Sequence, residues 1–183
     1  MQYIRALKAS PGFDNNLTHC IYGLDADLMM LALTTHEPNF CLLREEVLLK
    51  ESKTSRKDIF QVSQFHFLSI TLLREYLAVE FRVLLKRQDV DLERVIDDFV
   101  FMCFLIGNDF LPNIPTVDIS EGGIDTLFAI YGQVVPSLGG YLTDSGRLVL
   151  PNVEVFLKAL GDSEKEPEFC AEDNMDELLD RVR

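Results

Sequence analysis

The sequence lacks the paired cysteines that build structural zinc sites. Its four cysteines, at positions 20, 41, 103 and 170, lie far apart and none forms a CxxC pair, which argues against a structural zinc. Cys41 and Cys103 fall inside apolar runs, where reduced core thiols are expected, as in a protein of a reducing compartment. The longest apolar run, residues 99–107, is far too short to span a bilayer. We therefore predict an intracellular protein, and these features do not decide between cytoplasm and nucleus.

Basic residues are also scarce. The chain has 17 Lys and Arg against 30 Asp and Glu, a formal net charge of −13. Proteins that bind nucleic acid directly place Lys and Arg on phosphates, so this balance argues against a broad nucleic-acid surface. Two options remain open. Divalent cations can neutralise carboxylates and phosphates together, or the basic surface lies on sequence outside this chain.

What is present is the composition of a globular protein with a core. Hydrophobic residues make up 48% and charged residues 26% of the 183 positions, enough for one domain with or without a tail. We expect a domain over residues 1–160, followed by an acidic tail or the start of a linker over 161–183. Apolar periodicity, turn residues and helix caps predict strands at 19–24, 39–47 and 64–70, and helices at 1–9, 28–34, 72–86, 92–106, 124–134 and 153–160.

The first candidate site is the pair Asp25 and Asp27. Both follow the apolar strand expected at 19–24, at its carboxyl end, where α/β sheets place ligand sites. Two carboxylates separated by one residue can point to the same side and share a hard divalent cation, which prefers oxygen ligands. The alternative is a helix N-cap with a solvated turn acid, because Asp is favoured at both positions.

The second candidate is Asp109. It follows Gly107, which ends the helix expected at 92–106 and is suited to the left-handed conformation, and it precedes a proline-rich loop. The alternative is an Asx turn in which Asp109 binds its own backbone. Taken with the first pair, however, Asp109 suggests two acid-bearing turns that converge on one cluster, as two-metal phosphoryl-transfer sites require.

Asp97 and Asp98 are adjacent on the same expected helix and face different directions. We interpret them as structural, with one of them bonded to a buried partner such as Arg94 or Arg74, because buried charges persist chiefly when they are paired.

Several other polar residues are weaker candidates. His36 and Glu37 could be ligands, but a following proline favours a helix exit. His66, within an apolar strand, is expected to be a core histidine. Three arginines could contact phosphate or equally pair with neighbouring glutamates: Arg44, Arg74 and Arg82 beside Glu45, Glu75 and Glu80. The sequence assigns no other substrate-binding residues.

Long stretches of the sequence resemble the XRN family of nucleases. They include the run YGLDAD at 22–27 and the run GNDFLP at 107–112. The resemblance extends in the family's order over roughly residues 1–160. The matching stretches are residues 19–31, 35–40, 43–47, 73–77, 96–100, 107–112, 121–125 and 139–142.

The resemblance implies a PIN-like or flap-endonuclease-like α/β core with a central, mostly parallel sheet flanked by helices. It implies 5′-to-3′ hydrolysis of RNA from a 5′-monophosphate end, assisted by Mg²⁺ or Mn²⁺ in a two-metal site. The family's acids in these two motifs are catalytic metal ligands, and they correspond to Asp25, Asp27 and Asp109.

Two family features do not occur in this chain: an upstream acidic motif that supplies further metal ligands, and an upstream basic pocket for the 5′-phosphate. The resemblance therefore implies the C-terminal portion of the nuclease core, which partners a missing N-terminal half and is expected to be inactive alone. Two other readings are a non-catalytic binding or scaffold piece and a flap-type structure-specific endonuclease.

Overall fold

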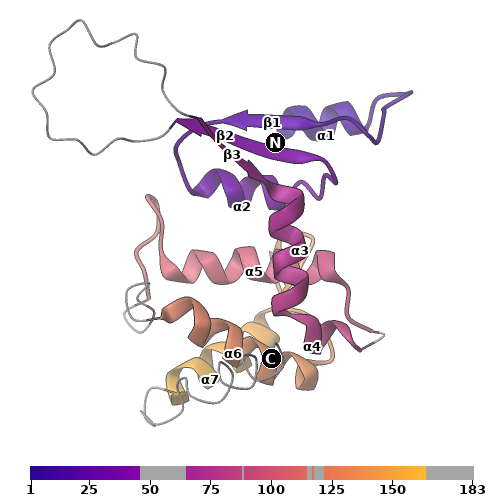
Figure 1. The fold of residues 1–183 in the computed structure, drawn as a ribbon. Coiled ribbons are helices and arrows are strands. Elements are labelled where there is room, and N and C mark those ends of the chain that lie inside the picture. Colours follow the sequence, from indigo (N-terminus) through magenta and orange to yellow (C-terminus); the bar gives the residue numbers. More distant parts are fainter. Residues whose placement is uncertain (46–64, 88, 115–116, 118–121, 164–183) are drawn as a thin grey trace, which may run out of the picture. The chain divides into compact units, whose positions relative to one another are not determined.

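The computed structural model describes residues 1–45, 65–87, 89–114, 117 and 122–163. The chain forms two compact units, Met1–Leu85 and Lys86–Arg183, whose helices and strands are labelled in Figure 1.

The first unit is a small sheet with helices. Its elements are α1 (Gln2–Lys8), β1 (His19–Tyr22), α2 (Asp27–Leu33), β2 (Phe40–Glu45), β3 (Phe65–Ser69), α3 (Ile70–Glu80) and α4 (Arg82–Leu85). The sheet order is β1-β2-β3. β1 and β2 are parallel, as expected for two strands joined through the helix α2, whereas β2 and β3 are antiparallel. The described sheet is therefore mixed, and not mostly parallel as expected from the family resemblance.

One face of this sheet is covered. Leu42 of β2 and Ile70 at the start of α3 are fully buried, and both α2 and α3 contact β2. The opposite face carries Tyr22, Phe65 and Phe67, which are 60%, 53% and 67% exposed and share one side by the strand register. We call Tyr22, Phe65 and Phe67 the open face. β1 is thus half-exposed, and not the buried strand that its apolar sequence predicts.

The prediction that His66 is a core histidine is wrong. Residues 65–67 are all exposed, and β3 is the edge strand of the described sheet. Apolar neighbours in the sequence did not bring this histidine into a core.

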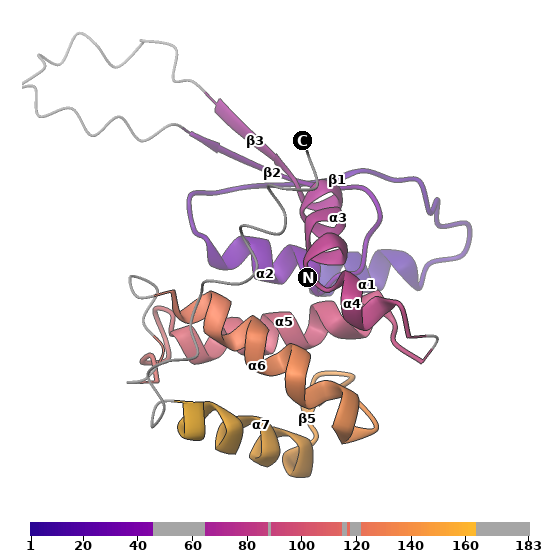
Figure 2. The same ribbon diagram turned by 60° about the horizontal axis from the view of Figure 1, so that its bottom comes forward.

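The second unit is helical. It contains α5 (Leu92–Ile106), α6 (Gly123–Leu138), the short strands β4 (Thr143–Asp144) and β5 (Arg147–Leu148), and α7 (Leu150–Ser163). α6 packs against both α5 and α7 (Figure 2). The buried side chains that form this core include Ile96, Met102, Leu127, Tyr131 and Phe156. No helix within the described ranges has the length and apolarity needed for a membrane span.

Local sequence accounts for the ends of α5. The Asp91 side chain accepts a hydrogen bond from the Glu93 amide at 3.1 Å, which satisfies one of the free donors of the first turn. At the other end, Gly107 has φ 97° and ψ 160°, so the helix stops at a positive φ but not in the left-handed helical conformation that we expected. α6 and α7 both extend beyond the predicted ranges. The boundary predicted at residue 160 stays a prediction, because 164–183 lie outside the described residues.

Candidate metal centre

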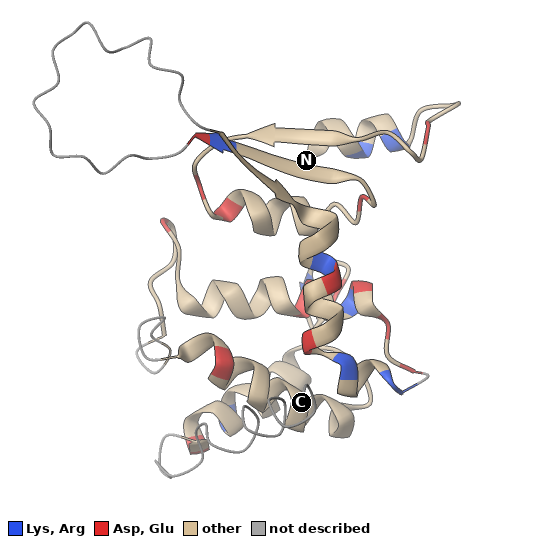
Figure 3. Ribbon diagram, in the orientation of Figure 1, with Lys and Arg blue, Asp and Glu red and all other residues tan. Residues whose placement is uncertain are grey.

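The turn between β1 and α2 carries the first two acids (Figure 3). The Gly23 amide still bonds to Leu43 O at 3.0 Å, so the chain leaves the sheet just before Asp25. One carboxylate oxygen of Asp25, Oδ1, accepts a hydrogen bond from the Asp27 amide at 2.9 Å. Asp25 is exposed and Asp27 is half-buried at the first position of α2. Asp25 therefore forms the turn that was part of the alternative, but neither acid is the helix N-cap, which is Ala26 without a side-chain cap bond. The Asp25 Oδ2 atom lies outside the turn bond.

The loop after α5 carries the third acid. The side chain that bonds to the backbone here belongs to Asn108 and not to Asp109: Asn108 Oδ1 accepts from the amides of Phe110 and Leu111, each at 2.9 Å. Asp109 is exposed. Within the described part of the chain, no hydrogen bond or ion pair reaches its carboxylate. The alternative in which Asp109 forms the Asx turn is therefore wrong, and neither of its oxygens is bonded to a described residue.

Asp25 and Asp27 lie in the unit Met1–Leu85, whereas Asp109 lies in the unit Lys86–Arg183. Among the described residues, no three side chains of His, Cys, Asp or Glu are grouped as a metal site. Convergence of the three carboxylates on one centre therefore stays a prediction. As donors they fit Mg²⁺ or Mn²⁺, because carboxylate oxygens are the ligands that hard cations prefer. The suggested phosphate contacts of Arg44, Arg74 and Arg82 stay a prediction as well.

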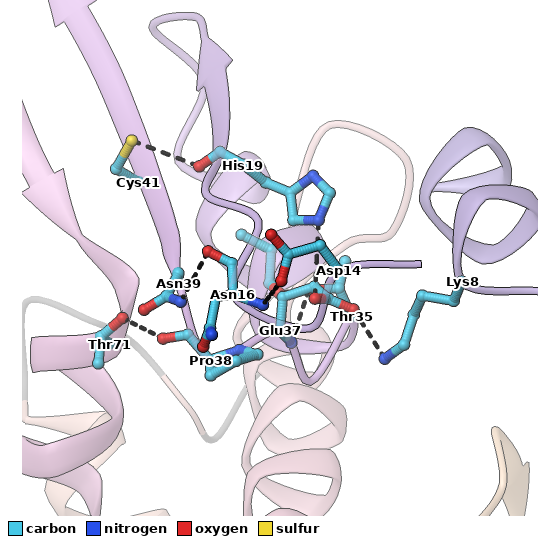
Figure 4. Close-up of polar contacts among 11 residues, drawn as sticks. Lys8, Asp14, Asn16, His19, Thr35, Glu37, Pro38, Asn39, Cys41 and Thr71 are labelled. Atoms are coloured by element: carbon cyan, nitrogen blue, oxygen red, sulfur yellow. Dashed lines mark hydrogen bonds and ion pairs between the residues drawn. The ribbon is translucent and has the colours of Figure 1, made fainter. Parts of the chain in front are cut away.

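A second group of charges lies at the amino end of β1 (Figure 4). Glu37 is 2% exposed and forms an ion pair with Lys8 of α1, with 2.7 Å between Nζ and Oε1. Its other oxygen is 3.6 Å from Nε2 of His19. The preceding residue, His36, has φ 53°. The ion pair of Glu37 thus links α1 to the segment before β2, which agrees with a structural role at a helix exit. Sequence reasoning missed the contact with Lys8, because the two residues are far apart along the chain.

Glu37→Gln is expected to lower the free energy of unfolding by roughly 1–2 kcal/mol, because the ion pair is lost while the amide keeps the volume of the side chain. The cost is smaller than for a fully buried pair, since the Lys8 side chain is 42% exposed and can return to water. Urea unfolding followed by circular dichroism measures it, with exposed Glu75→Gln as the matched control. Equal midpoints for the two variants would contradict a stabilising role for the pair.

Asp98 is the centre of a buried network in the second unit. It is fully buried, and its Oδ2 accepts from Tyr131 Oη and from the Leu142 amide, each at 2.8 Å. Its Oδ1 accepts from the Thr143 amide at 2.8 Å and from Thr143 Oγ1 at 2.7 Å. Burial raises the pKa of the Asp98 carboxyl, and these donors act in the opposite direction. The network joins α5 to α6 and β4.

The structural interpretation of Asp98 is confirmed, but its partners are Tyr131, Leu142 and Thr143 and not the suggested arginine. Arg94 instead donates to Thr143 O at 2.7 Å and pairs with Asp144 at 3.2 Å. Its guanidinium carbon also lies 4.9 Å from the centre of the Tyr141 ring, within the range of a cation–π contact.

Family models of known proteins match the two segments of the chain that contain the acidic motifs. Residues 1–46 match the family model described as the XRN 5′-3′ exonuclease N-terminus, and residues 89–176 match the one described as the Xrn1 helical domain. The chain belongs to the XRN family. The first match includes Asp25 and Asp27, and the second includes Asp109, so each unit carries a family segment together with its acids.

Curated relatives of this XRN chain are named as exoribonucleases. It is 46% identical over 168 residues to human 5′-3′ exoribonuclease 1, covering 91% of this chain and 10% of that protein. It is 44% identical over 168 residues to the Schizosaccharomyces pombe 5′-3′ exoribonuclease 1, covering 91% and 13%. It is 44% identical over 180 residues to the Saccharomyces cerevisiae 5′-3′ exoribonuclease 2, covering 90% and 18%. The chain thus spans less than a fifth of the length of these relatives.

Proposed function

We propose that this chain is the part of a 5′-to-3′ exoribonuclease that contributes Asp25, Asp27 and Asp109 to a divalent-metal centre. The parent enzyme would hydrolyse RNA that carries a 5′-monophosphate. The observation that carries the proposal is that two acidic loops, each within a segment matched to the XRN family, present exposed carboxylates. The names of the relatives support the class of reaction.

The chemistry follows from the donors. Bound Mg²⁺ or Mn²⁺ ions would supply an activated water and stabilise the leaving oxygen of the phosphodiester. Asp109 offers both carboxylate oxygens to such an ion, whereas Asp25 offers chiefly the oxygen that does not hold the Asp27 amide. The role of these residues is to hold and orient the ions at loops whose backbones are fixed by local hydrogen bonds.

We propose further that the chain is inactive by itself. Mg²⁺ requires near-octahedral oxygen coordination, and three carboxylates are few for two such ions. The net charge of −13 also disfavours a broad phosphate-binding surface within this chain.

Mn²⁺ titration of the ¹⁵N-labelled chain tests the metal role of Asp109. We expect paramagnetic broadening at residues 108–111, and Asp109→Asn should raise the apparent dissociation constant there about tenfold or more, because a primary oxygen ligand loses its charge. Asp125→Asn is the matched control, since Asp125 is an exposed acid on α6 and its loss changes the net charge equally.

An activity assay on 5′-monophosphorylated RNA with Mg²⁺ completes this test. We expect no degradation from the 5′ end by the chain alone. Robust degradation that Asp25→Asn abolishes would disprove the inactivity, and equal Mn²⁺ responses of Asp109→Asn and Asp125→Asn would disprove the metal role of Asp109.

A second candidate function is that of a binding or scaffold piece, and the open face favours it. Tyr22, Phe65 and Phe67 are exposed large aromatic side chains on one side of a sheet, and apolar surface of this kind often marks an interaction site. Size-exclusion chromatography with light scattering tests it over a range of concentrations. A monomer that does not associate with itself or with added XRN segments would count against this function.

A further inference from the structure

The loop that carries Asp109 is organised by the side chain next to it. Asn108 Oδ1 accepts from two successive amides, those of Phe110 and Leu111, each at 2.9 Å. The backbone N–H of Asn108 in turn donates to Leu111 O at 2.9 Å. One residue therefore closes the turn from both its side chain and its backbone, and Asp109 lies inside the turn that it closes.

Among the described residues, few other contacts fix the tip of this loop. Phe110 is 87% exposed and Leu111 is 50% exposed, so packing of these two side chains contributes little to the conformation. The ends are held by backbone bonds, from the Ile114 amide to Leu105 O at 2.9 Å and from the Gly107 amide to Phe104 O at 3.3 Å. Between these ends, Asn108 supplies the side-chain bonds that orient the backbone at Asp109.

The two acidic loops differ in which side chain closes the turn. In the turn after β1, Asp25 is itself the residue whose carboxylate closes the turn, through the bond from the Asp27 amide at 2.9 Å. In the loop after α5, the neutral side chain of Asn108 closes the turn, and the carboxylate of Asp109 takes no part in the hydrogen bonds of that turn. An aspartate that closes its own turn already uses one of its roughly four acceptor positions, so the second arrangement leaves a more complete ligand.

We propose that Asn108 is a positioning residue for Asp109: its side chain holds the loop backbone so that the Asp109 carboxylate is presented with both oxygens available to a divalent cation. This inference rests on the proposed function for the identity of the ligand. Asn108 itself binds no metal in this arrangement, because its side-chain oxygen is occupied by two amides.

The test compares Asn108→Ala with wild type in the full ¹⁵N-labelled chain. We expect amide hydrogen exchange at Phe110 and Leu111 to accelerate about fivefold or more, because two side-chain hydrogen bonds are lost. The apparent Mn²⁺ dissociation constant at residues 108–111 should rise by about the same factor or more. The melting temperature should stay within about 2 °C, since the side chain closes an exposed turn. A structural role alone would not move the Mn²⁺ response.

Two further variants sharpen the test. Asn108→Asp keeps an acceptor oxygen and should restore slow exchange at Phe110 and Leu111. It is judged by exchange only, because it adds a carboxylate that could itself bind Mn²⁺. Asn113→Ala is the matched control, an exposed asparagine of the same loop, and should change neither measurement.

The exchange rates and the Mn²⁺ response together test the role of Asn108 and the metal role of Asp109. Wild-type exchange rates in Asn108→Ala would overturn the inference, and so would accelerated exchange with an unchanged Mn²⁺ response. A wild-type chain whose loop does not respond to Mn²⁺ would overturn the proposed metal role of Asp109. Accelerated exchange in Asn108→Ala would in that case still support Asn108 as the residue that holds the loop.

Discussion

Asp98→Ala is expected to lower the free energy of unfolding of the chain by about 3–5 kcal/mol, a large effect for a single substitution. The carboxylate accepts from four donors and is fully buried. Alanine leaves the amides of Leu142 and Thr143 buried without this acceptor, and a buried unsatisfied donor costs roughly 1–3 kcal/mol. The Tyr131 and Thr143 hydroxyls lose their partner as well.

Urea unfolding followed by far-ultraviolet circular dichroism measures this change, and the loss of protection of the Leu142 and Thr143 amides in hydrogen exchange locates it. Asp144→Ala is the matched control. Asp144 pairs with Arg94 at 3.2 Å but its side chain is 63% exposed, so its removal should cost less than about 1 kcal/mol. A cost for Asp98→Ala no greater than that of the control would show that the network does not stabilise the unit.

Gly107→Ala is expected to lower the free energy of unfolding by roughly 2–3 kcal/mol, because its φ of 97° with ψ of 160° is accessible essentially to glycine alone. Space is also lacking, since a Cβ atom at this position would lie 2.7 Å from the backbone nitrogen of Asn113. The loop must shift to relieve this contact, so the Mn²⁺ response expected at Asp109 should weaken together with the stability.

Gly132→Ala is the matched control for the same substitution. Gly132 lies within α6 and an added Cβ would meet no heavy atom within 4 Å beyond its chain neighbours and the backbone of its own helix, so alanine should raise the stability by about 0.5–1 kcal/mol through its better helix propensity. The two variants should therefore shift the urea midpoint in opposite directions. A Gly107→Ala chain as stable as wild type would mean that the loop adapts without strain.

Several elements were predictable because short-range signals specify them. The helix α5 has the predicted range, since a capping aspartate precedes it, apolar residues recur along one side and Gly107 ends it. The strand β2 lies within its predicted range for a similar reason, as a short apolar run bounded by turn residues. The helix predicted over 72–86 was less accurate: it begins earlier, at Ile70, and is interrupted at Phe81.

Other features depend on partners distant in the sequence. Asp98 binds Tyr131, Leu142 and Thr143, which are 33 to 45 residues away, so no local pattern could identify them. The antiparallel pairing of β3, the exposure of His66 and the ion pair of Glu37 with Lys8 likewise depend on how segments meet in space.

The sequence by itself determined the family of this chain and the two acidic motifs, because both are carried by residues contiguous in the chain. Only the tertiary structure decided what the acids do locally: Asp25 closes its own turn, whereas Asn108 closes the turn that contains Asp109. Neighbouring Asn and Asp side chains have similar turn-forming propensities. The choice between them therefore depends on the backbone path from Gly107 to Ile114, which is set by the positive φ of the glycine and by the hydrogen bond from the Ile114 amide to Leu105 O.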